Sequence, residues 1–181
     1  KLGIDNQDIE AIKTVYNGVL RDSANQFYDS KFDIAKLSNI KNDAIKSILS
    51  AKLLEAQNRG ISISVEIEET VSNFRIELLD FITILSVLCD NAIEATIEAI
   101  SPRMTVAFMN NDDSLVLIVE NSIKAEKVDV SHIFARGYSS KGEGRGLGLH
   151  NVNSILEKYP KSTITTRSAN HLFSQTIRFC K

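Results

Sequence analysis

Apolar residues recur at helical spacing through the first third of the chain. One such stretch covers residues 6–28, and a second follows a polar break. The apolar positions of the second stretch are Ile34, Leu37, Ile40, Ala44, Ile48 and Ala51. Spacings of three and four predict two amphipathic helices joined by a turn. The second helix is expected to end near Asn58, because Gly60 suits the left-handed conformation of a helix stop.

The hydrophobic period changes to two immediately after Gly60. Residues 61–68 (ISISVEIE) alternate apolar and polar side chains, as expected for a strand with one solvated face. This change predicts a domain boundary near Gly60. We therefore expect residues 1–59 to form a helical hairpin and residues 60–181 to form a second domain.

The pattern beyond the boundary mixes helices and strands. It predicts a long helix at 75–99, a hairpin of strands at 104–109 and 115–119, a helix at 149–158, and closing strands at 162–168 and 172–179. An irregular stretch of about 25 residues between Asn121 and Gly146 is typical of lids and binding loops. Together these elements predict an α+β fold, with one sheet covered by helices on one face.

Composition narrows the range of partners. The 181 residues include 21 Lys and Arg against 23 Asp and Glu, and the resulting net charge of −2 disfavours nucleic acid as a partner. Cys89 and Cys180 are too few for a zinc site made of four cysteines. The richest apolar stretch, residues 81–89, is too short to cross a membrane. We expect a reduced, cytosolic chain.

An adjacent Asp90 and Asn91 in the predicted long helix form the first candidate site. Both residue types are poor helix formers, so something must offset the several tenths of a kcal/mol that each costs. Asn91 shares one helical face with Val87 and Glu94, and its carboxamide oxygen suits Mg²⁺ held against phosphates. The alternative is a solvated polar face without a ligand.

Glycine occupies every second position of residues 142–148, just before a predicted helix. Such glycines let backbone N–H groups approach an anion, and the helix N-terminus adds partial positive charge. The pattern therefore predicts a phosphate site. A dinucleotide fingerprint is disfavoured because Leu147 or Leu149 stands where its third glycine belongs, and a Walker-type loop is absent from the sequence. A turn without a ligand is the alternative.

The segment before the glycines carries hydroxyls and cations. Ser139 and Ser140 can donate hydrogen bonds to phosphate oxygens, and Lys141 and Arg145 bracket the glycine pattern with positive charge. A basic loop without a ligand is the alternative here. The order of helical Asn, hairpin, long loop and alternating glycines is far more specific than any one of these features.

Four motifs together resemble the nucleotide-binding domain shared by gyrase, Hsp90, histidine kinases and MutL, the GHKL superfamily. The motifs are residues 90–95 (DNAIEA), 119–122 (VENS), 133–134 with 137–141 (IF and GYSSK), and 144–149 (GRGLGL). More narrowly, the sequence from Gly60 onward resembles peptide-pheromone sensor histidine kinases of the Agr, competence and bacteriocin receptor type. The resemblance implies a Bergerat-type ATP-binding α/β sandwich, a mixed sheet with helices on one face, preceded by an α-helical hairpin.

The resemblance also implies roles for individual residues. Asn91 is expected to bind Mg²⁺. Residues 144–149, the glycine box, are expected to hold the triphosphate of ATP together with the irregular stretch before them, which would form a lid. The residues that it assigns to the nucleotide are Asn91, Asn121, Ser139, Ser140, Lys141, Gly144, Arg145, Gly146, Leu147, Gly148 and Leu149.

Two departures from the family pattern carry information. Residues 120–124 (ENSIK) stand where the family usually has Asp-x-Gly-x-Gly, so we expect Asn121 to accept a hydrogen bond from the adenine amino group. Val87 stands where gyrase-like ATPases carry a glutamate that activates water. Without a carboxylate there, water has no general base, which favours a kinase over a hydrolase.

A phosphoacceptor histidine is missing from the predicted hairpin, since His132, His150 and His171 all lie later in the chain. We expect the acceptor to lie upstream of Lys1, and this stretch to bind ATP and Mg²⁺ without autophosphorylating. By resemblance, the hairpin forms a homodimer and a response regulator receives the phosphoryl group. The resemblance further implies the cytoplasmic part of a bacterial plasma-membrane receptor, which a peptide pheromone reaches only through an upstream membrane sensor.

Two other functions compete with this interpretation. A catalytically silent dimeric adaptor that no longer binds nucleotide is suggested by the missing glycines at residues 120–124. A serine-protein kinase of the anti-sigma type belongs to the same superfamily, but it would lack the long two-helix leader predicted here.

Overall fold

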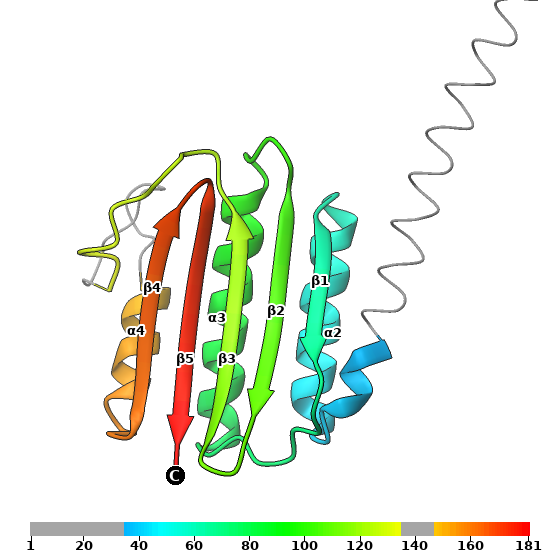
Figure 1. Ribbon diagram of the computed structural model, residues 1–181, viewed down its shortest axis with the longest axis vertical. Coiled ribbons are helices and arrows are strands. Elements are labelled where there is room, and N and C mark those ends of the chain that lie inside the picture. The colour runs from blue at the N-terminus through cyan, green and yellow to red at the C-terminus, as the bar shows by residue number, and fades with distance from the viewer. Residues whose placement is uncertain (1–34, 135–146) are drawn as a thin grey trace, which may run out of the picture.

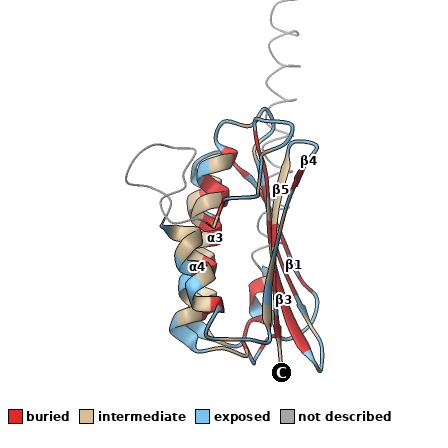
Figure 2. Cartoon of the chain, turned by 90° about the vertical axis from the view of Figure 1, so that its left-hand side faces the viewer, coloured by how far each residue is buried: buried red, intermediate tan, exposed pale blue. Residues whose placement is uncertain are grey.

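A five-stranded sheet forms one layer of the protein in the computed structural model, which describes residues 35–134 and 147–181. The strands are β1 (Ser62–Ile67), β2 (Arg103–Asn110), β3 (Ser114–Ser122), β4 (Ser162–Ala169) and β5 (Leu172–Cys180). The helices are the short 3-10 helix η1 (Lys36–Asn39) and the α-helices α2 (Asp43–Asn58), α3 (Leu78–Thr96) and α4 (Gly148–Leu156). Figures 1 and 2 show the α-helices as a second layer against one face of the sheet.

The sheet is mixed, with the order β1-β2-β3-β5-β4. β1 pairs with β2 in parallel, because the chain crosses over through α3 between them, and the other pairs are antiparallel. The β2–β3 turn is closed by Asn111, whose Oδ1 accepts hydrogen bonds from the backbone N–H groups of Asp113 and Ser114. The predicted α+β architecture, a mixed sheet with helices on one face, is confirmed.

The hydrophobic core lies between the two layers, where Figure 2 shows the buried residues facing one another. Phe81 of α3 is fully buried at its centre. Its ring centroid lies 4.7 Å from that of Phe74, 5.5 Å from that of Phe179 on β5 and 6.3 Å from that of Phe108 on β2. These aromatic contacts fix the start of α3 against the carboxyl ends of β2 and β5.

The second predicted helix differs from the structure in its start and in its buried face. Asn42 caps α2, because its Oδ1 accepts hydrogen bonds from the N–H groups of Ala44 and Ile45, so the helix begins at Asp43 and not near Ile34. The buried residues of α2 are Ile45, Leu49, Leu53 and Ala56, whereas Ala44 and Ala51 are exposed and Ile48 is half-buried. The prediction of one continuous helix is therefore wrong, and the buried face lies one or two positions later than the predicted 44, 48 and 51.

The segment before α2 is tied to the sheet edge. Ile40 forms a parallel β-bridge with Val71, Lys41 N–H donates to the carbonyl of Val71 over 2.9 Å, and the N–H of Val71 donates to the carbonyl of Asn39 over 2.9 Å. The side-chain amide of Asn39 also donates to the carbonyl of Ile67 at the end of β1 over 2.7 Å. These bonds interrupt the helical pattern that the sequence showed through Leu37 and Ile40.

α2 shares its core with the rest of the described protein. Its buried residues belong to the same hydrophobic cluster as α3 and the sheet strands. Gly60 follows the helix with a φ of +76°, in the left-handed conformation predicted for a helix stop. The division of the chain at Gly60, with a dimerising hairpin before it, stays a prediction because residues 1–34 lie outside the described part.

Most other predicted elements are confirmed with shifted ends. The long helix covers residues 78–96 within the predicted 75–99, and all five predicted strands form. The described part of the irregular stretch, residues 123–134, contains neither helix nor strand. None of the helices in residues 35–134 and 147–181 is long and apolar enough to span a membrane.

Candidate functional site

Asp90 and Asn91 leave the C-terminal half of α3 in different directions. Asp90 turns toward α2, where its Oδ1 accepts a hydrogen bond of 2.5 Å from Nζ of Lys52. Burial alone would lower the pKa of the Lys52 ammonium, but the hydrogen bond and charge of Asp90 outweigh it and hold this pKa above its ordinary value. Asp90 therefore joins two helices, which leaves Asn91 as the residue available to a ligand.

Asn91 faces α4. Val87 lies one helical turn before Asn91 on the same side of α3, and a methyl group added to Gly148 would lie 3.1 Å from Cγ1 of Val87. The N-terminus of α4 thus packs directly against the turn of α3 that precedes Asn91. A side chain at position 148 would require Val87 to shift by a few tenths of an ångström, so glycine suits this close approach.

The first turn of α4 presents backbone N–H groups beside this contact. Leu147 precedes the helix without a side-chain capping bond, and the N–H of Asn151 is the one that donates to its carbonyl. Leu147 is about half exposed and Leu149 is half-buried. A helix start of this kind offers N–H donors and partial positive charge to an anion. The structure thus places the predicted residue Gly148 beside Val87, one helical turn before Asn91.

Asn121 lies near the end of β3 on the helix-covered face of the sheet. It is 3% exposed and is paired across the sheet with Met104 and Phe173. Its Nδ2 donates a hydrogen bond of 2.9 Å to the carbonyl of Ser122. The side chain is therefore held in place by a local bond at the edge of the core.

The chain that leaves β3 is anchored to the β4–β5 turn. The N–H of Ile123 donates to the carbonyl of His171, and the N–H of His171 donates to the carbonyl of Glu126, each over 2.9 Å. The N–H of Val128 donates to Oγ of Ser168 over 2.9 Å. The start of the predicted lid is therefore fixed. The predicted phosphate ligands Ser139, Ser140, Lys141, Gly144, Arg145 and Gly146 lie outside the described residues.

The residues present fit a magnesium ion that arrives with a nucleotide. The described residues hold no group of three or more His, Cys, Asp or Glu side chains placed to bind a metal. Such a cage is unnecessary for nucleotide-bound Mg²⁺, because phosphate oxygens and water fill most of its octahedral shell. Among described residues, the Nδ2 atom of Asn91 is buried without a hydrogen-bond partner. The Asn91 carboxamide is thus not committed to a structural bond through its nitrogen.

Sequence reasoning missed two polar residues on the helix-covered face of the sheet, Gln175 and Thr166. Gln175 of β5 is 2% exposed, and it pairs with Thr166 of β4. The signal was present in the sequence, since Gln175 interrupts the apolar alternation of Phe173, Ile177 and Phe179.

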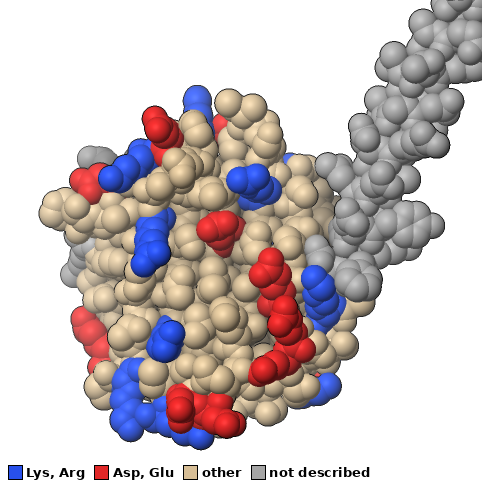
Figure 3. Space-filling model, in the orientation of Figure 1, with Lys and Arg blue, Asp and Glu red and all other residues tan. Residues whose placement is uncertain are grey.

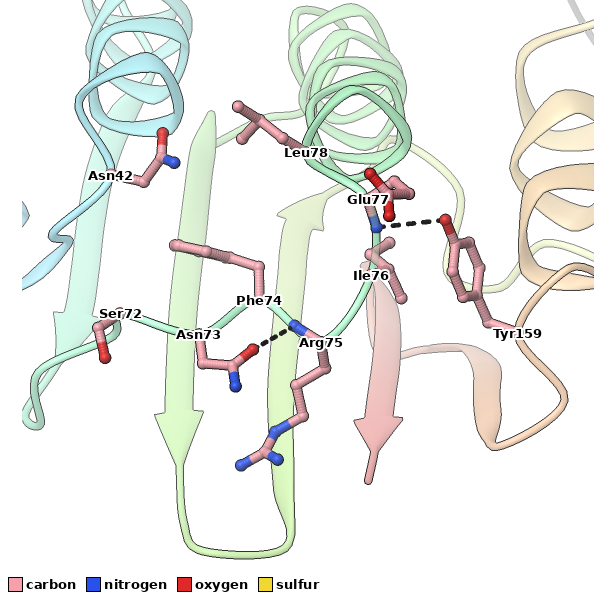
Figure 4. Close-up of a pocket in the computed structure, with 9 residues that line it drawn as sticks. All are labelled: Asn42, Ser72, Asn73, Phe74, Arg75, Ile76, Glu77, Leu78 and Tyr159. Atoms are coloured by element: carbon pink, nitrogen blue, oxygen red, sulfur yellow. Dashed lines mark hydrogen bonds between the residues drawn. The ribbon is translucent and has the colours of Figure 1, made fainter.

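The opposite end of the α-helical layer holds a separate surface pocket of about 680 Å³. Its lining comes from residues 72–77 in the loop before α3, from Leu78 at the start of α3, and from Asn42 and Tyr159 (Figure 4). The Tyr159 hydroxyl accepts a hydrogen bond from the N–H of Glu77 over 3.2 Å and donates to Oδ2 of Asp80 over 2.6 Å. These bonds join the end of α4 to the start of α3, far along the helix from Asn91.

The face of the sheet turned away from the helices carries acidic side chains near β1 and an arginine near β4. Acidic side chains gather over β1 and the chain that follows it (Figure 3), where Glu66, Glu68 and Glu69 line a pocket of about 370 Å³. Arg167 lines a further pocket on the same face over β4 and β5. The predicted site residues Asn91, Asn121 and Gly148 belong to the other, helix-covered side.

Comparisons with known proteins identify the family. The model of the family described as the GHKL domain matches residues 76–180. The sensor protein CitS of Bacillus subtilis (strain 168) is 29% identical over 125 residues, which cover 66% of this chain. The matched part is 23% of the length of CitS, so the chain spans less than a quarter of that relative.

Solved structures share the fold. The catalytic domain of histidine kinase ThkA, in a nucleotide-free form, superposes with a TM-score of 0.63 at 20% identity, over 78% of this chain and 92% of that domain. The Acinetobacter baumannii histidine kinase AdeS gives a TM-score of 0.60 at 15% identity, over 99% of this chain and 86% of AdeS. The mycobacterial sensor histidine kinase MprB gives 0.58 at 16% identity, over 74% of this chain and 92% of MprB.

Proposed function

Because this chain belongs to the GHKL domain family, we propose that it binds ATP with Mg²⁺ and serves as the catalytic domain of a sensor histidine kinase. The observation that carries the proposal is the contact of Val87 with Gly148. The contact supports a site in which the N–H groups at the start of α4 lie about one helical turn from Asn91, so that one carboxamide and one helix N-terminus can act on the same ligand. Triphosphate and a hard cation are the chemistry that suits such a pair.

In the proposed site, the Oδ1 atom of Asn91 binds the magnesium ion, which bridges phosphate oxygens and neutralises their charge. Gly148 and Leu149 offer backbone N–H groups to the phosphates, as would Gly144, Gly146 and Leu147. Side chains of Ser139, Ser140, Lys141 and Arg145 complete the cradle with hydrogen bonds and positive charge. Asn121 accepts a hydrogen bond from the adenine amino group.

The chemistry that this arrangement supports is phosphoryl transfer to a histidine. Transfer to neutral imidazole needs positioning and charge neutralisation more than a general base, since imidazole is already a nucleophile. Val87 offers no carboxylate to activate water at the turn before Asn91, which disfavours hydrolysis. None of the three histidines of this sequence, His132, His150 and His171, lies in the predicted N-terminal helices, so we propose that this stretch binds ATP without labelling itself.

The wider assignment extends this function to a two-component receptor. We place the chain in the cytoplasmic part of a bacterial plasma-membrane sensor, dimeric through its N-terminal helices, that passes the phosphoryl group to a response regulator. Peptide quorum sensing is the proposed signal, with the pheromone bound only by a membrane segment outside this chain. The likeness to CitS, named a sensor protein, supports the sensor assignment but not the choice of a peptide.

Isothermal titration calorimetry with ATP tests the core of the proposal. Wild-type protein should bind ATP with Mg²⁺ and lose most of this affinity in EDTA. Asn91→Ala should lower the affinity in Mg²⁺ at least tenfold while changing the affinity in EDTA little, because the variant removes the metal contact. Asn58→Ala, which changes an exposed residue at the end of α2, is the matched control and should bind as the wild type does.

The catalytically silent adaptor predicts the opposite result. At an ATP concentration about 100 times the dissociation constant, binding adds roughly 2.7 kcal/mol of stability, which a thermal melt detects readily. An adaptor without nucleotide binding would show no shift with ATP and Mg²⁺. Equal affinity of the wild type and Asn91→Ala in Mg²⁺ would overturn the metal role of Asn91.

A further inference from the structure

Gln175 is a buried polar residue in an apolar position. It lies in β5 between Phe173 and Ile177, it is 2% exposed, and within the described residues its Nε2 has no hydrogen-bond partner. An unpaired amide in a protein interior costs free energy, so it calls for a reason. A leucine or phenylalanine there would fill the core without this cost.

Gln175 faces the helices and not the open side of the sheet. Its register partner on β3 is Val119, a member of the hydrophobic core, whereas its neighbours Ser174 and Thr176 line a pocket on the outer face. Its partner on β4 is Thr166, whose Oγ1 is likewise buried and unpaired among described residues. Two adjacent strands therefore point unsatisfied polar atoms into the same side of the sheet.

Asn91 and Gln175 lie at about the same level along the direction of the strands. The contact of Phe81 with Phe179, whose ring centroids are 5.5 Å apart, gives a common reference point for both positions. From Phe81, the ten residues to Asn91 raise α3 by about 15 Å. From Phe179, the four residues back to Gln175 cover about 14 Å of β5 in the same direction. Asn91 also faces α4, which covers the sheet on the side of β4 and β5 (Figure 1).

The unsatisfied atoms are therefore concentrated in one region. Four buried side-chain nitrogen or oxygen atoms lack a partner in the described part of the chain, and three of them belong to Asn91, Thr166 and Gln175. The fourth, Nε of Arg75, belongs to the loop before α3 at the other end of that helix. Such a concentration indicates a site in which a ligand supplies the missing hydrogen bonds.

We propose that Gln175, with Thr166 beside it, is the part of the nucleotide site that recognises the purine base. This inference rests on the proposed function, which places the phosphates at Gly148 and the metal at Asn91. A glutamine carboxamide pairs with adenine through two hydrogen bonds, because it accepts from the exocyclic amino group and donates to a ring nitrogen. The Thr166 hydroxyl can donate or accept at the same edge.

Asn121 adds a second carboxamide to the same face of the sheet. It is paired with Phe173, two residues before Gln175, so Asn121 and Gln175 are diagonal neighbours about 7–8 Å apart between their Cα atoms. The adenine amino group carries two N–H donors, and the two carboxamides can share them. Base recognition then needs no aspartate of the kind found in the Asp-x-Gly-x-Gly pattern that the family usually has at residues 120–124.

Replacement of Gln175 by methionine separates a ligand role from a structural one. Methionine has a similar shape and no buried donor, so Gln175→Met should unfold at a urea concentration equal to or higher than that for the wild type. Its affinity for ATP with Mg²⁺ should fall at least tenfold. Its affinity for inorganic tripolyphosphate with Mg²⁺ should stay within twofold of the wild type, because that probe has no base.

Replacement by glutamate tests the hydrogen-bond pattern itself. A carboxylate only accepts hydrogen bonds, which suits the two N–H donors on one edge of guanine and repels the ring nitrogen of adenine. Gln175→Glu should therefore move the ratio of GTP to ATP affinity toward GTP at least tenfold. Gln57→Met, on a half-buried glutamine of α2, is the matched control and should leave both nucleotide and tripolyphosphate binding unchanged.

The outcomes distinguish this inference from the function on which it rests. Wild-type protein that binds neither ATP nor tripolyphosphate overturns both. Wild-type protein that binds ATP no more tightly than tripolyphosphate overturns base recognition alone. Base recognition by Gln175 is also overturned if Gln175→Met binds ATP as the wild type does. It is overturned equally if this variant unfolds more easily and loses both ligands to the same extent, since Gln175 would then act in folding.

Discussion

Nζ of Lys52 on α2 lies 2.5 Å from Oδ1 of Asp90 on α3, and this ion pair joins the two helices directly beside Asn91. The Lys52 side chain is 22% exposed and that of Asp90 is 46% exposed, so solvent screens the pair only in part. The adjacent Asp90 and Asn91 thus have different roles. The aspartate joins α3 to α2, and the asparagine is the residue that we propose binds the ligand.

Breaking the Lys52–Asp90 pair should lower the free energy of unfolding. In a double-mutant cycle of Lys52→Met and Asp90→Asn, we expect a coupling of about 0.5–1 kcal/mol at neutral pH, measured by urea unfolding. The same cycle on Lys46 and Asp43 of α2 is the matched control. That pair should show a coupling near zero, because the Asp43 side chain is 93% exposed.

The pH dependence of this coupling has a defined sign. The pKa of Lys52 is raised in the folded protein, so its contribution is fully present below the ordinary lysine pKa of 10.5 and is lost as the pH rises through the folded value. The coupling measured at pH 7 should therefore shrink above pH 10.5. A coupling that grows on the alkaline side would contradict the assignment.

The Tyr159–Asp80 hydrogen bond should stabilise the protein mainly at neutral pH. The Tyr159 hydroxyl and the Lys158 ammonium hold the pKa of Asp80 below its ordinary value of 3.8, against the opposing effect of burial. This contribution is present above that ordinary value and is lost as the pH falls through the folded one. Tyr159→Phe should cost about 1 kcal/mol at pH 7 and much less at pH 2, by urea unfolding. In the Asp80→Asn background, the cost at pH 7 should shrink.

The contact of Val87 with Gly148 should appear as a coupling between the two positions. A methyl group at 148 would meet Cγ1 of Val87 at 3.1 Å, so Gly148→Ala crowds the wild-type site. The same substitution should be better tolerated by about 1 kcal/mol in a Val87→Ala background. Chemical denaturation of the four proteins in the cycle measures this term. Strictly additive effects would show that the two residues are not in contact in solution.

The two cysteines should differ sharply in reactivity. Burial, with the nearby charge of Asp90, raises the pKa of the Cys89 thiol to about 12, whereas Cys180 is partly exposed at the end of β5. Iodoacetamide at pH 8 should therefore modify the native protein once, at Cys180, as read by mass spectrometry. Urea should expose the second site. Cys180→Ser should leave the native protein unlabelled, and labelling of that variant would contradict the packing of α3.

Strands and the central helix were predictable because their periods are strong. Residues 61–68 alternate strictly, and the buried residues of α3 include Leu85, Leu88, Cys89 and Ala92, the side that the sequence assigned to the core. The face of α2 was not predictable from spacing alone. Ala44, Ile48 and Ala51 formed a plausible apolar stripe, and only the capping by Asn42 and the β-bridge of Ile40 select the neighbouring stripe.

The candidate site was predictable where its residues break a local rule. Asn91 stood out because it interrupts a helix, and Gly148 stood out because it belongs to an alternating run. Lys52 carried no such signal, since a single lysine on an amphipathic helix is ordinary and its partner lies 38 positions away. Gln175 did break the apolar alternation of β5, but one polar residue in a strand gains meaning only when its burial is known.

The hydrogen bonds from residues 39–41 to Ile67 and Val71 also determine which elements a force on the incoming chain reaches first. A twist applied to the chain where the described part begins, at residue 35, reaches the end of β1 and the loop leading into α3 before it reaches α2. The loop after Val71 leads into α3, and α3 carries Asn91. Torque on the incoming chain would therefore act on the helix that we propose binds the metal.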